Sequence, residues 1–154
     1  MIKFLKNFLI MLMALMVATV TWQIFTRFIL NDPSLYTEEI AGFLLIWIGM
    51  LGATYALSNK SHIGIDILTK NLVGYKKNLS EVLIYTFIII FSFSVLIIGG
   101  TRLVFITLSL AQVSPALNIK MGYIYLVVPL TGFIMIIFSV NFILAVFKKD
   151  NFLR

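Results

Sequence analysis

The chain has 154 residues, of which 61% are hydrophobic and 12% are charged, and its net charge is +6. Soluble domains average about 45–50% apolar and about 25% charged residues, so this composition excludes an ordinary soluble domain. The length leaves no room for a membrane anchor joined to a sizeable soluble enzyme. With no cysteine and with His62 as its single histidine, the chain cannot form thiolate metal sites or bis-histidine haem ligation.

Four apolar runs predict four transmembrane helices, over residues 8–30, 40–57, 82–108 and 123–147. Each run reaches the roughly 17–25 residues that cross a hydrocarbon core, and backbone groups in lipid must pair within their own segment, which favours helices. The first run is too long for a signal-peptide core, so we expect an uncleaved span. The sequence therefore predicts an all-α integral membrane protein, with residues 1–154 in a single membrane domain.

The connection between the second and third runs predicts an additional short helix. Four apolar residues can share one helical face: Ile63, Ile67, Leu68 and Leu72. Asp66 and Lys70 lie four residues apart on the opposite face, in the orientation that stabilises a helix. This pattern predicts an interfacial amphipathic helix over residues 63–73, between the second and third spans. An ordinary loop is the alternative, because Gly64 and Gly74 weaken the pattern.

The basic residues predict the orientation of the chain. With the N-terminus inside, nine lysines and arginines lie on the inner side, and Arg27, Arg102 and Lys120 lie on the outer side. The positive-inside rule therefore places both termini in the cytoplasm. Because the basic residues flank apolar runs, they indicate membrane topology, and we expect no nucleic-acid partner.

Chemical activity has little support within the spans. The second and fourth runs contain no charged residue, and the first and third hold only Arg27 and Arg102, toward their outer ends. Ion-coupled carriers usually keep an ionisable group inside the bilayer, where it costs about 2.5–3.5 kcal/mol. Residues 129–132 predict a proline kink, with a broken transporter-type helix as the alternative. We expect no enzyme activity, metal or cofactor in this chain, since one histidine cannot complete a catalytic set.

Packing surfaces are easier to find. A polar stripe recurs every four residues on the first helix, and small residues recur four apart on the second helix, beside a mid-span tryptophan. Small residues at this spacing let helices approach closely, and association in lipid depends on such packing. We predict that these faces bind a partner through the following residues: Thr19, Gln23, Arg27, Trp47, Gly49, Gly52, Ala53 and Ala56.

Polar residues near the helix ends are predicted to anchor the chain at the membrane interface. Negative charge at the start of the second helix suits the helix dipole, and Arg27 could pair with Glu38 or Glu39 or remain solvated. His62 is expected to make local hydrogen bonds. The predicted anchors are Glu38, Glu39, His62, Asp66 and Lys70.

Two short motifs resemble a known family. They are His-Ile-x-x-Asp at residues 62–66 and Ser-Pro-Ala-Leu at residues 114–117. Together with Arg27, Glu38-Glu39 and Trp47 before them, these motifs resemble the small membrane subunit of the tripartite ATP-independent periplasmic (TRAP) transporters, over nearly the whole chain. The sequence departs from the family at Lys120, where proline is common, and at residues 59–61, which replace an arginine.

The resemblance implies a division of labour. A large membrane subunit would carry the sodium and substrate sites and move like an elevator. A periplasmic protein would deliver an organic acid, such as a C4-dicarboxylate or sialic acid. This chain would brace the large subunit in the bacterial inner membrane, in contact with phospholipid, and would help to dock the periplasmic protein.

The outer connections supply candidates for docking that protein: Asp32, Ser34, Tyr36, Ser114 and Lys120. Two alternatives to the bracing role remain open. The first is an autonomous four-helix channel or small carrier. The second is the anchor subunit of a membrane enzyme, which the shortage of histidine disfavours.

Overall fold

The computed structural model describes residues 2–59 and 75–152. Within them the helices are α1 (Ile2–Phe28), α2 (Leu35–Ser58), α4 (Tyr75–Phe91), η1 (Ser92–Gly99), α5 (Gly100–Ser109), α6 (Met121–Tyr125) and α7 (Val127–Phe152). The described part contains four helical segments long and apolar enough to cross a membrane, which confirms the predicted fold class. The interfacial helix predicted over residues 63–73 lies outside the described residues, as do His62, Asp66 and Lys70.

The helices extend beyond the apolar runs that predicted them. α1 begins at Ile2 where residue 8 was expected, and α2 begins at Leu35 where residue 40 was expected. The third segment, residues 77–109, is continuous through α4, η1 and α5. Hydropathy locates the part of a helix that crosses hydrocarbon, whereas backbone hydrogen bonding continues into the polar interface, so the two boundaries differ.

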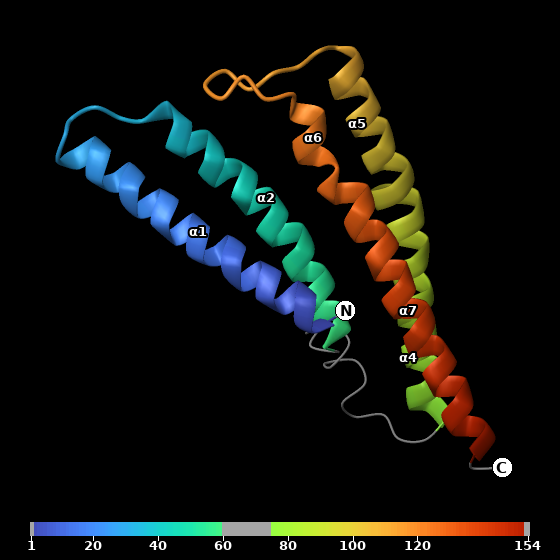
Figure 1. The fold of residues 1–154 in the computed structure, drawn as a ribbon. Coiled ribbons are helices and arrows are strands. Elements are labelled where there is room, and N and C mark those ends of the chain that lie inside the picture. The colour runs from blue at the N-terminus through green and yellow to red at the C-terminus, as the bar shows by residue number, and fades with distance from the viewer. Residues whose placement is uncertain (1, 60–74, 153–154) are drawn as a thin grey trace.

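The membrane helices stand in a row. α1 packs on α2, α2 packs on α7, and α7 packs on α4 and η1 (Figure 1). Both termini lie toward one end of the helices, and the connections at residues 29–34 and 110–120 lie at the opposite end of the helices. We call the end with these two connections the loop end.

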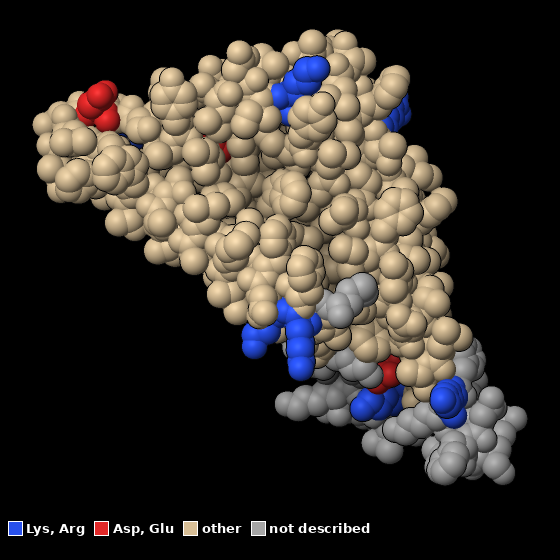
Figure 2. Space-filling view, viewed as in Figure 1, with Lys and Arg blue, Asp and Glu red and all other residues tan. Residues whose placement is uncertain are grey.

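Charged side chains avoid the middle of the molecule. On the face drawn in Figure 2 they gather toward the two ends, and an uncharged band separates them. Large apolar side chains such as Phe87, Phe105 and Phe133 are more than half exposed along the helices. In water such exposure would promote aggregation, whereas in lipid it is the ordinary state of a membrane-facing side chain.

Glycines bring α7 into close contact with the third segment. A Cβ built on Gly132 would lie 2.9 Å from the Leu96 Cβ and 3.2 Å from the Ser92 carbonyl oxygen, both in η1. A Cβ on Gly100 would lie 2.8 Å from a methyl group of Val128 and 3.0 Å from the Pro129 Cδ. The widened π-helical turns of η1 therefore pack against α7 where α7 lacks a side chain.

The fourth segment is interrupted where the sequence predicts a proline kink. α6 ends at Tyr125 and α7 begins at Val127, because Pro129 has no N–H to donate to the carbonyl one turn earlier. The Trp47 indole Nε1 donates a hydrogen bond of 3.1 Å to the Ile124 carbonyl beside this break. Trp47 therefore joins α2 to α6 within this chain; its contact with a partner stays a prediction.

Replacing Trp47 with phenylalanine should lower the free energy of unfolding by about 1 kcal/mol, because the Ile124 carbonyl loses its indole donor. Thermal unfolding of the purified chain in detergent measures the change. Trp22→Phe is the control, since Trp22 is 54% exposed. Equal stability of the two variants would contradict a structural role for the indole hydrogen bond.

Candidate functional site

One carboxylate connects α2 to the loop-end connection before α6. Glu39, in the second turn of α2, accepts a hydrogen bond from the Ala116 N–H at 2.9 Å and another from the Leu117 N–H at 3.0 Å. The Ser114 hydroxyl donates a third hydrogen bond to the same carboxylate. We call this set of contacts the Glu39 clamp; it joins residues 75 to 78 positions apart in the sequence.

The connection folds locally so that its donors converge. Ser114 N–H donates to the Ile119 carbonyl at 2.9 Å, and Val113 pairs antiparallel with Lys120. Asn118 closes the turn with a φ of 56°, a conformation that asparagine tolerates better than most residues. Pro115 contributes no N–H, so the next two backbone donors are the ones that reach Glu39. Ser114 is 1% exposed, which places its hydroxyl inside the clamp.

A carboxylate suits this position because it only accepts hydrogen bonds. Its two oxygens offer about four lone-pair sites, and donors occupy three of these sites here. Hydrogen bonds to charged groups are about twice as strong as neutral ones. Within the described residues no ion pair joins Arg27 to Glu38 or Glu39, so the pairing that the sequence left open is not formed and Glu39 binds the connection instead.

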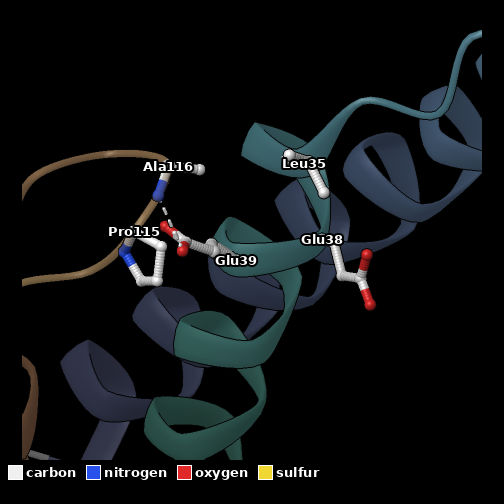
Figure 3. A pocket seen from close by; sticks show the side chains of 5 residues that line it. All are labelled: Leu35, Glu38, Glu39, Pro115 and Ala116. Atoms are coloured by element: carbon white, nitrogen blue, oxygen red, sulfur yellow. Dashed lines mark hydrogen bonds between the residues drawn. The ribbon is translucent and has the colours of Figure 1, made fainter.

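A cavity of about 480 Å³ lies beside the clamp, lined by Leu35, Glu38, Glu39, Pro115 and Ala116. In Figure 3 the Glu39 side chain points toward Pro115 and Ala116, and the Glu38 side chain points away from them. Glu38 is exposed and Glu39 is half-buried. The two neighbouring glutamates therefore have different environments, which their adjacency in the sequence did not reveal.

The small residues predicted to bind a partner lie along an uncovered face of α2. Gly49 and Ala53 are exposed, and Gly52 and Ala56 are half-buried. A Cβ built on Gly42, Gly49 or Gly52 would meet nothing within 4 Å. We call this the glycine face. Within the described part of the chain, these glycines are not used for internal packing, unlike Gly100 and Gly132.

The polar stripe of α1 is oriented differently from the glycine face. Thr19 and Gln23 are half-buried and continue the line of the buried residues Leu5, Leu9 and Leu12, which join the cluster shared with α2. The Thr19 hydroxyl donates to the Leu15 carbonyl at 2.8 Å. Arg27 is exposed. Thr19 and Gln23 therefore lie on the side of α1 that faces α2.

The docking candidates fall into two groups. Asp32, Tyr36 and Lys120 are exposed at the loop end. Ser34 is half-buried, and it caps α2 without a side-chain hydrogen bond. Ser114 differs from the expectation of an exposed docking residue, because its side chain is buried against Glu39 and does not reach the surface. A sequence pattern marks Ser114 as part of a loop but does not show which way its hydroxyl points.

Sequence reasoning missed the two backbone donors of the clamp, at Ala116 and Leu117, and the close approach at Gly132. The only sequence signal for the clamp is the presence of a glutamate at the start of one helix and a Ser-Pro turn before another. No group of three or more His, Cys, Asp or Glu residues that could hold a metal occurs in the described ranges 2–59 and 75–152.

These features define a multi-pass helical membrane protein with an uncovered glycine face and a loop-end connection secured by one carboxylate. The chain belongs to the DctQ component of the tripartite ATP-independent periplasmic transporters, whose family profile matches residues 16–149. Members of this family are small permease subunits.

Individual relatives agree with this assignment. The chain is 38% identical over 89 residues to a sialic acid TRAP transporter small permease protein of Vibrio cholerae; the match covers 58% of this chain and 51% of the relative. It is 30% identical over 135 residues to an isethionate TRAP transporter permease protein of Oleidesulfovibrio alaskensis, covering 84% of this chain and 21% of the relative. A putative TRAP transporter small permease protein of Haemophilus influenzae is 27% identical over 84% of this chain and 79% of the relative. The chain thus spans about half or less of the length of the first two relatives.

Proposed function

We propose that this chain braces the large permease subunit of a sodium-coupled TRAP transporter for an organic acid and helps to dock the periplasmic substrate-binding protein. The uncovered glycine face of α2 carries this proposal, because small residues that pack against nothing in their own chain suit the close approach of another membrane helix. Sodium and substrate would bind to the large subunit.

The arrangement of the helices supports bracing over the alternative of an autonomous channel. The described helices form a row, and a single row does not surround a central pore. Their membrane-crossing parts also lack the mid-bilayer carboxylate that an ion-coupled carrier usually needs. A row of helices offers a broad lateral surface, which suits a stationary support for a moving neighbour.

The relatives support the choice of partner and of substrate. In the Oleidesulfovibrio alaskensis protein the matching region is 21% of a much longer permease chain, which suits a segment that works beside a larger permease. The relatives named for their substrates transport sialic acid and isethionate, both organic anions. We place the chain in the bacterial inner membrane with both termini cytoplasmic, because Lys3, Lys6, Lys77 and Lys148 lie at the end opposite the loop end.

Reconstitution tests the proposal. Liposomes that hold this chain together with its large subunit should take up labelled sialic acid or another organic acid when binding protein and a sodium gradient are supplied. Liposomes that hold this chain alone should show no saturable flux, because on this proposal the substrate binds to the large subunit. Saturable flux from the chain alone would favour the autonomous carrier instead.

A further inference from the structure

We propose that Glu39 is a positioning residue for docking: it holds the loop-end connection, residues 110–120, in the shape that the periplasmic binding protein recognises. This inference rests on the proposed function and adds to it the residue that sets the docking surface. Glu39 itself is half-buried and acts through the connection that it binds.

The Glu39 clamp reaches the exposed residues of the connection through the turn that it binds. Glu39 binds the turn at Ser114, Ala116 and Leu117. The same turn is paired across its base, where Val113 lies antiparallel to Lys120 and Met121 N–H donates to the Gln112 carbonyl at 2.9 Å. A turn held at its tip and its base has one shape. Because Glu39 holds the tip, it determines where the exposed residues Pro115 and Asn118 stand relative to α2.

Assembly of the helices does not depend on the clamp. α2 also packs on α7 through the cluster that contains Leu44, Leu51 and Val127, and Trp47 donates to the Ile124 carbonyl. These contacts lie deeper along the helices and remain when Glu39 is changed. Loss of Glu39 should therefore release the connection while the row of helices persists, and docking and assembly can be separated.

The chemistry of the Glu39 side chain allows a conservative substitution to weaken the clamp. Glutamine has the shape of glutamate, but its amide offers one accepting oxygen and an NH2 group that cannot accept. In Glu39→Gln this NH2 would face N–H or O–H donors that now point at a carboxylate oxygen. Ser114→Ala removes one of the three donors and leaves both backbone hydrogen bonds, so its effect should be in the same direction and smaller.

The experiment measures the affinity of the purified binding protein for the complex of this chain with its large subunit, held in nanodiscs. We expect Glu39→Gln to raise the Kd by about tenfold and Ser114→Ala by about threefold, since each weakens the hydrogen bonds that preset the surface. Glu81→Gln is the matched control, because it makes the same chemical change in α4, far from the loop end. Its Kd should equal that of the wild type.

Three readouts decide the outcome. Weaker docking with unchanged complex yield and unchanged melting temperature supports the proposal. Unchanged docking in Glu39→Gln overturns it, and so does a loss of complex yield or melting temperature that explains the weaker docking, because Glu39 would then be structural only. If the wild-type complex itself does not bind the binding protein, the proposed docking function fails, which is distinguishable from failure of the positioning role.

Discussion

Replacing Gly49 with leucine should reduce the amount of large permease subunit that co-purifies with this chain by about tenfold, the factor that corresponds to about 1.4 kcal/mol. Gly49 lies on the glycine face, where a Cβ meets nothing within 4 Å in this chain. A leucine there would hold a partner helix away from α2, and association in lipid depends on close packing. Affinity purification of the co-expressed subunits from detergent, quantified against wild type, measures the effect.

Gly99→Leu is the matched control for this prediction. Gly99 is also exposed, and a Cβ built on it would lie 3.9 Å from the Ser94 carbonyl oxygen. It lies in η1, which is separated from α2 by α7 in the row of helices. We expect wild-type amounts of large subunit with this variant. The reverse result, in which Gly99→Leu blocks co-purification and Gly49→Leu does not, would move the interface from α2 to the third segment.

Replacing Gly132 with leucine should destabilise the chain itself by about 3 kcal/mol or more, at the upper end of the cost of overpacking a core. Even a Cβ at this position would lie 2.9 Å from the Leu96 Cβ and 3.2 Å from the backbone oxygen of Ser92. Backbone cannot move aside as a flexible side chain can, so η1 and α7 must separate. We expect little monodisperse protein after detergent extraction and a markedly lower melting temperature.

Gly49→Leu serves here as the stability control, because a Cβ at that position meets nothing within 4 Å. The two variants therefore have different expected effects: Gly132→Leu impairs folding of the chain, and Gly49→Leu impairs its association with the large subunit. If Gly132→Leu melts at the same temperature as Gly49→Leu, the close contact between η1 and α7 does not contribute to stability as we argue.

Hydropathy predicted the number and approximate position of the membrane segments, because the transfer of each side chain into lipid depends on that side chain alone. It did not predict the π-helical turns of η1 or the separation of α6 from α7 at Leu126. Pro129 signalled a kink, but the widened turns of η1 face Gly132 of a helix more than 30 residues further along the chain. This packing contact joins residues far apart in the chain, so it has no local sequence pattern.

The candidate site shows the same limit. Spacing placed Gly49 and Ala53 on one face of a helix, and Gly100 is likewise a small residue within an apolar run. Only the structure separates them, since Gly100 packs against Val128 and Pro129 whereas Gly49 is open. Small residues permit close approach of any helix, within the chain or from a partner, and the sequence does not distinguish the two cases.

What the sequence determined by itself is the solvent in which the chain folds and the helical character of its spans, because long apolar runs must enter lipid and lipid requires paired backbone groups. What only the tertiary structure decided is which polar group meets which. Periodicity relates residues three or four positions apart. It carries no information about Glu39 and the Ser114–Leu117 turn, which lie about 75 residues apart and meet because α2 packs on α7, the helix that follows this turn and α6.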